Sequence, residues 1–538
     1  MDRSMELTAS RQGNGLRSTD QDLDVMAKIG KKQQFSRIFG FLSTLALSST
    51  LLASWESVAE SISAGLTNGG PVSLVYGMLL SISGTFALAA SLAEMASICP
   101  ISGAQYHWTY MFAPPKWAAF ITWMQGWCTV FAWQATVTSV TFLTATQIQG
   151  LMILNYPNYV PERWHGTLLM WAYLAILFAA NVWGIRLLPL IELMGGICHI
   201  AFFIMILIAI VVLAPRSSAE FVFTGFTNGG GWQSDGVSWC IGLLTVVYCF
   251  VGFDGAIHMS EEVKNAATTI PKVIMLTIAI NATLAFGFLI ALLFCLGDVE
   301  TVLSTPTGYP IIAIFVQATN SNAAGTVMEA GLIIIAFASG FALLASVSRL
   351  TFAFARDGGM PFSKFFAYVD PHYHIPIRAI SLVCIIIMLL SLINIGSSIA
   401  LNAILSLSTL ALYISYLVPI TLFAMKRLRK NEPIAFGPFT LGKFGLAINI
   451  YAICFGVFIV IFLPFPVATP VSGGSMNYAA PVFIFLMLVA LVDWFVRGKK
   501  HYAGPTREIG AVGERDEERK GPEVNIMAHS SSGAKGLE

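Results

Sequence analysis

The stretch FDGAIH at residues 253–258 and the stretch WESVAE at residues 55–60 decide the fold that this sequence predicts. Each begins with an aromatic residue, continues with an acid and a small residue, and has a second ionisable residue four places after the acid. Both lie inside long apolar runs, where a charged side chain costs at least about 2.5–3.5 kcal/mol to insert into a membrane. Two acids in matching surroundings of this kind indicate membrane helices whose polar residues have a function.

The composition places the whole chain in the membrane class. Of its 538 residues, 56% are hydrophobic and 11% are charged, against about 25% charged in a typical soluble domain. Apolar runs of about 20 residues are expected to be transmembrane helices. We therefore predict an all-α integral membrane protein with twelve transmembrane helices, at about residues 38–64, 72–98, 117–149, 166–184, 187–214, 237–259, 272–297, 326–355, 378–396, 399–424, 444–465 and 478–497.

The basic residues predict how these helices are oriented. An even number of spans puts both termini on one side of the membrane, and all but two of the 30 Lys and Arg residues then fall on that side. The exceptions are Arg163 and Arg216. Because short loops rich in Lys and Arg stay on the cytoplasmic side, we expect both termini to be cytoplasmic.

The two ends of the chain differ in composition from the rest. Residues 1–35 and 501–538 are charged and rich in Gly and Ser, with no apolar period, which predicts disordered cytoplasmic tails. Residues 36–500 then form a single twelve-span domain in contact with membrane lipid. The net charge of +1 gives no electrostatic reason to expect a nucleic-acid partner.

The similarity of the two opening stretches has a structural meaning. The first span runs outward and the sixth runs inward, so a match between them predicts a five-plus-five inverted repeat with helices 1 and 6 broken near mid-membrane. Two C-terminal helices follow the repeat. Gly252 and Gly255 flank Asp254 and lower the cost of unwinding a helix. In the first span, the hydroxyls of residues 48–50 and of Ser54 can satisfy freed backbone groups.

A pair of unwound helices makes a binding site for a small molecule. Freed amides attract a carboxylate, freed carbonyls attract an ammonium group, and aromatic rings cover a cation. The candidate substrate-binding residues are Ser54, Trp55, Glu56, Ser57, Tyr248, Gly252, Phe253, Asp254 and Gly255. Glu56 and Asp254 are also proton-coupling candidates, because a carboxylate inside the membrane can titrate and so link binding to pH. Ordinary helix packing would equally explain Trp55 and Phe253, and a helix cap or an internal ion pair would explain Asp254.

Four further acids lie in or near the predicted spans. Glu60 shares the first span with Glu56. Glu94 and Glu192 lie near the inner ends of their spans, where a long charged side chain reaches the membrane surface at little cost. Glu329 lies near the outer end of its span, where it can be outside the membrane. We therefore rank Glu94, Glu192 and Glu329 below Glu56 and Asp254 as site residues.

The sequence carries no catalytic motif. It contains no Walker A loop, no Gly-rich dinucleotide turn after a strand, no HExxH and no nucleophile elbow. The eight cysteines are scattered singly through apolar stretches, without the spacing of metal ligands. We therefore expect no enzyme activity, no metal and no cofactor, and the lack of an ATP site argues against a primary pump.

Three longer motifs carry a resemblance to a known family. They are SLAEMASICPISGAQY at residues 91–106, GFDGAIHMSEEVKNA at residues 252–266 and ARDGGMP at residues 355–361. The chain resembles the amino acid–polyamine–organocation permeases over residues 36–500, and most of all their fungal amino acid/choline branch, which includes GABA and choline permeases. The resemblance implies the inverted-repeat fold and a substrate site at the two broken helices. We expect a multi-pass protein of the plasma membrane, with an internal membrane as the alternative.

One departure from the family pattern bears on the substrate. Many members have a Gly-rich stretch in the first span that binds the carboxylate of the substrate, whereas residues 51–57 read LLASWES without glycine. An acid there, Glu56, would repel a carboxylate and attract a cation, so the substrate must carry a positive nitrogen. We expect a secondary transporter that imports amino acids or related amines such as GABA by proton symport.

Three alternatives stay open at this stage. A choline or quaternary-amine permease would suit Trp55 and Glu56, because such a ligand needs only aromatic rings and an acid. A transporter-like nutrient sensor would keep the fold but signal through its tails, which are short here. A channel would show no accumulation of substrate against a gradient.

Overall fold

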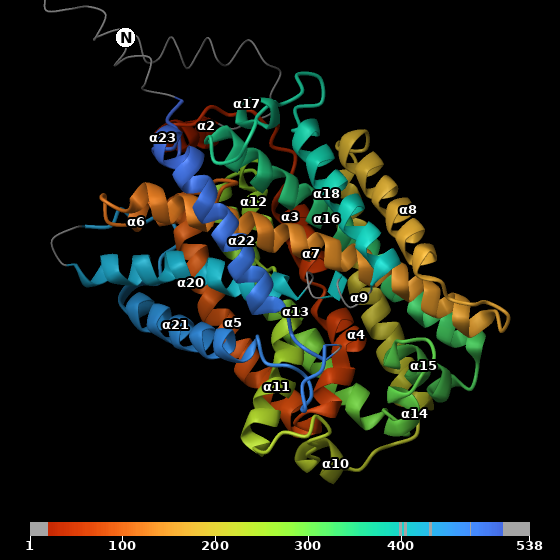
Figure 1. The fold of residues 1–538 in the computed structure, drawn as a ribbon. Coiled ribbons are helices and arrows are strands. Elements are labelled where there is room, and N and C mark those ends of the chain that lie inside the picture. Colours follow the sequence, from red (N-terminus) through yellow and green to blue (C-terminus); the bar gives the residue numbers. More distant parts are fainter. Residues whose placement is uncertain (1–19, 398–400, 403–405, 430–432, 474, 509–538) are drawn as a thin grey trace, which may run out of the picture.

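The protein is built of helices packed side by side (Figure 1). The computed structural model describes residues 20–397, 401–402, 406–429, 433–473 and 475–508, and these residues form no named β-strand. Among them, ten helices are long and apolar enough to cross a membrane. They are α5 (Gly70–Ile98), α7 (Ala118–Asn155), α8 (Arg163–Val182), α9 (Leu188–Leu213), α13 (Ala266–Phe294), α16 (Asn322–Arg356), α18 (Ile377–Gly396), α20 (Leu407–Leu428), α21 (Gly445–Phe462) with the turn before it, and α22 (Ala479–Asp493) with the turns after it.

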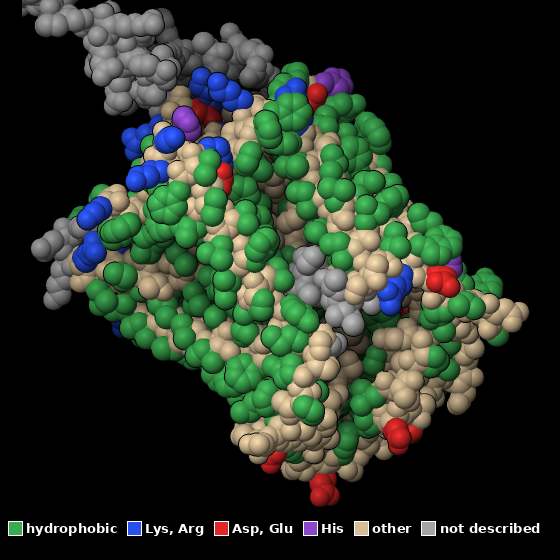
Figure 2. Space-filling model, viewed as in Figure 1, with side chains coloured by type: hydrophobic (Ala, Val, Ile, Leu, Met, Phe, Trp, Pro, Cys, Tyr) green, Lys and Arg blue, Asp and Glu red, His purple; other side chains and the backbone are tan. Residues whose placement is uncertain are grey.

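The surface of these helices suits lipid. A helix of about 20 residues spans the hydrocarbon core of a bilayer and satisfies its own backbone groups there. Large apolar side chains such as Leu190 and Ile484 are more than half exposed, at 56% and 57%. Figure 2 shows hydrophobic side chains over the middle of the molecule, with few charges among them. This surface suits lipid tails and would be costly in water.

The first apolar segment is broken into two helices. Helix α3 (Phe41–Leu52) ends and α4 (Ser54–Thr67) begins on either side of Ala53, whose φ of 42° is left-handed. The freed amide of Ser54 donates to Asn281 Oδ1 at 3.1 Å, and the freed carbonyl of Leu51 accepts from Ser339 Oγ at 3.4 Å. Side chains from α13 and α16 therefore bond the backbone groups that the break leaves free.

The hydroxyl groups that were expected to bond the freed backbone groups at this break do not do so. Ser48 Oγ and Ser54 Oγ are buried without a hydrogen-bond partner in the described part of the chain. Thr50 Oγ1 donates to the carbonyl of Ala46 within its own helix. The expectation was wrong because the αL turn at Ala53 directs the freed backbone groups toward α13 and α16, away from the hydroxyls of α3.

The second break is longer. Helix α11 (Asp235–Tyr248) ends six residues before α12 (Gly255–His258), and the chain between them is not a regular helix. Gly252 has a φ of 95°, which an L side chain rarely adopts. A Cβ added to Gly255 would clash with the side chain of Leu51. The two breaks therefore lie against each other, and glycine permits this contact.

Short elements connect the long helices. They are α2 (Asp20–Ile29), α6 (Gln105–Phe112), α10 (Ala219–Thr224), η1 (Ser260–Glu262), α14 (Val299–Leu303), α15 (Pro310–Thr319), α17 (Ser363–Phe366), η2 (Gly442–Phe444), η3 (Trp494–Gly498) and α23 (Lys499–His501). Helix α3 packs against α9, α13 and α16, and α4 packs against α11 and α13. The broken helices thus lie inside the molecule, surrounded by longer helices.

Both described ends of the chain lie at the same end of the molecule. Helices α2 and α23 lie close together in Figure 1, and Figure 2 shows Lys and Arg side chains gathered in that region. The opposite end in the same view carries acids and little basic charge. The basic residues that the sequence predicts on one side of the membrane therefore gather at one end of the molecule.

The boundaries of the two tails differ from those expected. Residues 20–35 were expected to be disordered, but α2 forms there and Lys31 and Phe35 are 1% and 0% exposed. Residues 501–508 likewise pack against the helices, with Tyr502 buried. Charges that suggest a solvated tail are instead paired with charges on distant segments, as described below. Residues 1–19 and 509–538 lie outside the described residues.

Candidate functional site

A cavity of about 70 Å³ lies beside the two breaks. It is lined by the end of α3 and the start of α4, by one face of α7, by the chain after α11 and by one face of α16. On the same measure a water molecule needs about 10–15 Å³, so the cavity has room for about five to seven atoms of that size. This is the size of a small amine or amino acid.

The structure brings some of the predicted site residues together at this cavity. Four of the nine line it, namely Glu56, Ser57, Tyr248 and Gly252. The other five are Ser54, Trp55, Phe253, Asp254 and Gly255, and they lie behind the cavity wall.

The two predicted aromatic residues pack away from the cavity. The ring centroid of Trp55 lies 5.1 Å from that of Phe288 and 5.8 Å from that of Phe203. The ring of Phe253 lies 5.0 Å from that of Tyr416. Both rings therefore pack between helices, which is the alternative that the sequence left open for them.

Glu56 lines the cavity and has one carboxylate oxygen without a protein partner among the described residues. Its Oε1 lies 2.7 Å from His199 Nδ1 on α9. Its Oε2 is buried and has no hydrogen-bond partner among the described residues. Glu56 is 3% exposed and His199 is 1% exposed, so the pair is shielded from water. A carboxylate held this way can receive an ammonium group at Oε2.

Sequence reasoning missed His199. A histidine inside the run 187–214, which is apolar apart from Glu192, was a usable signal, because polar residues in membrane helices usually face a partner. What the sequence lacked was the pairing of α9 with α4. His199 Nε2 has no partner among the described residues, so its single proton in the neutral state belongs on Nδ1, where it donates to Glu56.

Glu60 is the second acid on the cavity wall. It lies four residues after Glu56 on α4, and both line the cavity. Gln147 Nε2 donates to Glu60 Oε1 at 2.8 Å. Because a carboxylate only accepts, the amide nitrogen of Gln147 must face Glu60, and Gln147 Oε1 is left buried without a partner among the described residues.

Asp254 is fully occupied by protein donors. Its Oδ2 accepts from Gln105 Nε2 at 2.5 Å and from Trp133 Nε1 at 3.2 Å. Its Oδ1 accepts from the hydroxyl of Tyr416 at 2.5 Å. These donors come from α6, α7 and α20, so the carboxylate ties three helices to the second break. Its side chain is 0% exposed.

His258 adds a proton-holding group to this cluster. Its Nδ1 lies 2.8 Å from the carbonyl oxygen of Ser102, and because a carbonyl only accepts, Nδ1 carries a proton. Its Nε2 lies 3.3 Å from Asp254 Oδ2. A proton at Nε2 completes an ion pair there. Asp254 and His258 therefore lie at ion-pair distance from each other, and neither lines the cavity.

The remaining acids have different surroundings. Glu94 pairs with Arg427 and accepts from the amide of Leu441 at 2.8 Å, as a structural ion pair would. Glu192 is 0% exposed, and its Oε2 lies 3.1 Å from Thr50 Oγ1. Glu329 is also 0% exposed, and neither of its oxygens has a partner among the described residues. None of the three lines the cavity.

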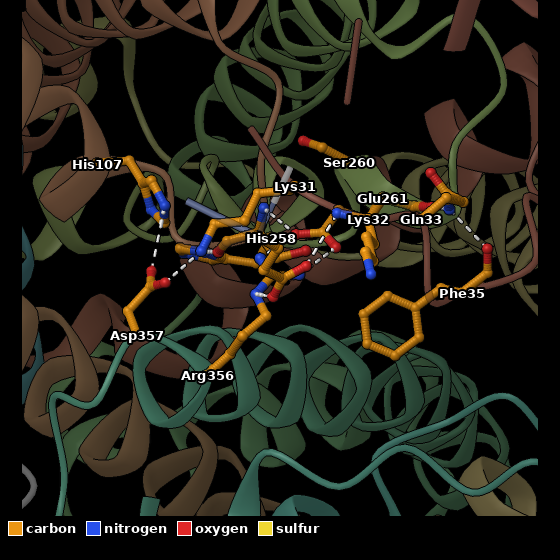
Figure 3. A network of polar contacts seen from close by, with 12 residues as sticks. Lys31, Lys32, Gln33, Phe35, His107, His258, Ser260, Glu261, Arg356 and Asp357 are labelled. Carbon is orange, nitrogen blue, oxygen red and sulfur yellow. Dashed lines mark hydrogen bonds and ion pairs between the residues drawn. The ribbon is translucent and has the colours of Figure 1, made fainter. Parts of the chain in front are cut away.

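A network of hydrogen bonds and ion pairs lies at the end of the molecule where Lys and Arg side chains gather (Figure 3). Asp357 pairs with Lys31 and accepts from Tyr106 OH at 2.9 Å and from Thr506 Oγ1 at 3.0 Å. His107 Nε2 also lies 3.2 Å from Asp357 Oδ2. One acid therefore holds together the N-terminal segment, α6, the end of α16 and the C-terminal segment.

A second pair in the same network is bidentate. Arg356 donates to both oxygens of Glu261, at 2.9 Å and 2.8 Å, and the amide of Ser102 donates to the same acid at 3.3 Å. Burial would raise the pKa of Glu261, but the guanidinium of Arg356 outweighs burial and holds that pKa below its usual range. The network is therefore ionised and fastens η1 to α16.

The fold and the cavity define a class of protein. Two broken helices beside an acid-lined cavity in a helical membrane protein are the arrangement found in transporters of small molecules. The chain belongs to the amino acid permease family, whose family model matches residues 39–489. It is a permease and not an enzyme. The family resemblance carried by the three sequence motifs is confirmed.

Named relatives are similar over most of their length. A choline transporter of Saccharomyces cerevisiae is 32% identical over 86% of this chain and 82% of its own. The amino-acid permease BAT1 of Arabidopsis thaliana is 30% identical over 90% of this chain and 96% of its own. Its homolog in Oryza sativa subsp. japonica is 30% identical over 90% and 95%.

Proposed function

We propose that this permease imports amino acids or related amines and binds their positive nitrogen in the cavity beside the two breaks. One observation carries the proposal. Glu56 offers a buried, unpartnered carboxylate oxygen at the cavity wall, and none of the lining residues, all of them in the described part of the chain, is Lys, Arg or His. A cationic nitrogen is the group that neutralises such an acid.

The carboxylate of an amino acid has a place near this acid. The amide of Ser54, at the start of α4, is taken by Asn281. The next amides of the first turn have no carbonyl of their own helix to bond, and a helix start attracts negative charge. A substrate whose amine and carboxylate are well separated, such as GABA, can then place its amine at Glu56 and its carboxylate at the start of α4.

Choline is the second candidate. The name of the yeast relative supports it. The geometry supports it less, because Trp55 packs against Phe288 and Phe203, and Tyr248 is the aromatic residue on the cavity wall. Without further rings a quaternary ammonium has little of the aromatic cover that such ligands use.

The proposed architecture has twelve spans. The ten long helices and the broken pairs α3–α4 and α11–α12 together make this number. The breaks near Ala53 and Gly252 support a five-plus-five inverted repeat, after which α21 and α22 complete the bundle. We place both termini in the cytoplasm and the protein in the plasma membrane. An epitope tag near Glu162 that is inaccessible from outside intact cells would refute this orientation.

We propose that protons drive import. Glu56 with His199 can take up a proton in the cavity, and Asp254 with His258 can hold one behind it. A movement of the broken segments would change the surroundings of both pairs, and this is how a proton and a substrate become coupled.

Uptake of a labelled panel tests the proposed function. The full chain is expressed in cells that lack their own amine and amino-acid permeases, and uptake of GABA, other amino acids and choline is measured. We expect accumulation of at least one compound with a positive nitrogen above its external concentration. Equilibration without accumulation would indicate a channel, and no uptake by protein present at the cell surface would indicate a sensor.

A further inference from the structure

One buried acid has no role in the site described above. Glu329 lies in the third turn of α16 and is 0% exposed. Neither of its carboxyl oxygens has a hydrogen-bond partner among the described residues. The sequence allowed this acid to lie outside the membrane, in water, but the structure buries it. A buried acid without a partner needs a physical explanation.

Glu329 lies on the face of α16 that lines the cavity. The lining residues of this helix include Leu332, Ala336 and Ser339. Glu329 precedes them by three, seven and ten residues, and side chains at this spacing share one face of a helix. It therefore lies one turn beyond Leu332, on the side away from Arg356 and the basic end of the molecule. The proposed orientation places this end outside.

Helix α15 lies over the same end of the cavity helices, and we call it the outer cap. It packs against α4, α9 and α16, and in Figure 1 it lies at the end of the molecule away from α2 and α23. The hydroxyl of Tyr309, which directly precedes it, lies 2.5 Å from Thr146 Oγ1 and 3.2 Å from the carbonyl oxygen of Leu143, both on α7. The outer cap therefore joins both sides of the cavity.

The titratable groups around Glu329 do not balance a negative charge. Among the described residues, the charged group that acts on it is the carboxyl of Glu60 on α4, a like charge. Tyr309 precedes the outer cap, and Tyr173 on α8 donates to a backbone carbonyl of α16 at 2.7 Å. His199 on α9 is paired with an acid of α4. Helices α3 and α7 contain no Asp, Glu, His, Lys or Arg, and the charge of α18 lies at its basic end.

This environment accepts only the neutral form of the acid. An ionised carboxylate that is buried without a hydrogen bond or a countercharge is strongly destabilised, and the group takes up a proton instead. Glu329 differs in this respect from Glu56 and Asp254, each of which has a histidine nitrogen within 3.3 Å. Those two acids can be buried with their charge, whereas Glu329 cannot.

We propose that Glu329 is a proton-binding site and that it must be protonated before the outer cap closes over the cavity. With the cap open, water reaches the carboxyl, and a glutamic acid in water is ionised at neutral pH. Closing the cap then requires that one proton from the external water binds one carboxylate oxygen, which gives the neutral acid. The inference rests on the proposed function, because import needs the outer side to open and close.

Exchange at equal pH on both sides of the membrane tests this site. Proteoliposomes with the full chain are loaded with unlabelled GABA, or with the panel compound that cells accumulate, and the entry of the labelled compound is timed. Without a gradient, exchange still requires the outer cap to open and close. We expect the wild-type rate to rise at least about threefold when the pH falls from about 7.5 to about 5.5. A rate that does not rise would overturn the proposal.

The variant Glu329→Gln separates the proton site from a structural role. The amide resembles the neutral acid and cannot ionise, so at about pH 7.5 we expect exchange at least about threefold faster than in the wild type. Glu329→Met is a second neutral variant, because the acid has no partner to lose. Glu329→Asp should keep the wild-type response, as should Glu192→Gln, the matched change at another buried acid. A wild-type response in both neutral variants, or an equal loss of exchange at every pH, would overturn the proposal.

Failure of the inference differs from failure of the proposed function. If a compound with a positive nitrogen is accumulated and exchanged but the neutral variants respond to pH as the wild type does, the proton site is wrong and the proposed function stands. If no such compound is accumulated or exchanged by protein present in the membrane, both are wrong.

Discussion

The carboxylate of Glu56 and the imidazole of His199 are joined by a 2.7 Å contact between Oε1 and Nδ1. The histidine comes from α9, and the acid lies in the first turn of α4, just after the break at Ala53. The contact holds one carboxylate oxygen and leaves the other without a partner among the described residues. The orientation of the proposed ammonium site therefore depends on a helix that does not line the cavity.

Removing the negative charge of Glu56 should impair transport directly. In Glu56→Gln the side chain keeps its shape but cannot neutralise an ammonium group, so we expect uptake to fall at least about tenfold, equivalent to about 1.4 kcal/mol. Initial uptake rates at equal amounts of surface protein measure this. Glu192→Gln should be much milder, because Glu192 does not line the cavity. Normal uptake by Glu56→Gln would mean that the acid is structural.

Asp254→Asn should affect both transport and stability. One carboxylate oxygen becomes an NH₂ group that faces the donors of Gln105, Trp133 or Tyr416. A buried donor left unpaired costs about 1–3 kcal/mol, and we expect uptake to fall at least about tenfold. Thermal unfolding of the purified protein and uptake together check this. Wild-type values for both would show that the cluster is dispensable.

Proton symport predicts a definite response to pH. Uptake should rise as the external pH is lowered and should collapse when an uncoupler removes the proton gradient. Both effects follow if an acid at the cavity must take up a proton from outside before the substrate is carried inward. Initial rates in buffers of different pH, with and without uncoupler, measure them. An uptake rate that changes neither with the external pH nor with the uncoupler would favour exchange or facilitated diffusion.

The Asp357 network predicts how stability depends on pH. Burial would raise the pKa of the Asp357 carboxyl, but the neighbouring His107, Lys31 and Arg356 together outweigh burial and hold that pKa below its usual range. The unfolded value is about 3.9, so the stabilisation is fully present above about pH 4. It is lost as the pH falls through the lowered pKa of the folded state. Between about pH 5 and 8 this contribution should be constant.

The variant Asp357→Asn tests this network at neutral pH. It leaves Lys31 buried beside a neutral amide, and breaking a buried pair in this way costs about 3–5 kcal/mol. Thermal unfolding at pH 7 should show the loss, and the double variant Lys31→Met with Asp357→Asn should recover much of it. Equal stability of the single variant and the wild type would show that the N-terminal segment contributes little.

The glycines predicted the longer break better than the hydroxyls predicted the shorter one. Gly252 and Gly255 indicated an interruption, and both are needed there, one for a positive φ and one for contact with Leu51. The break at Ala53 has no such signal, because alanine rarely adopts a left-handed conformation. It is enforced by Asn281 and Ser339 from distant helices, which no local pattern reveals.

The site was partly predictable for a similar reason. The sequence selects polar residues in apolar runs, and this identified Glu56 and Asp254. It does not show which side of a broken helix faces the cavity, so it grouped Asp254 with Glu56 although the protein donors of Asp254 lie behind the wall. Glu60 was not among the predicted site residues, and it lines the cavity beside Gln147 of α7. The roles of these residues in transport stay predictions.

Protection of a cysteine at position 57 tests most directly whether substrate occupies this cavity. Ser57→Cys is introduced where the more accessible native cysteines, Cys198, Cys240 and Cys454, are replaced by Ser, and its reaction with a membrane-permeant maleimide is timed. With a transported amine at about ten times its Kd, we predict labelling about tenfold slower, because about one site in ten stays empty. Unchanged labelling, with the same amine still accumulated by cells carrying this variant, would contradict the account.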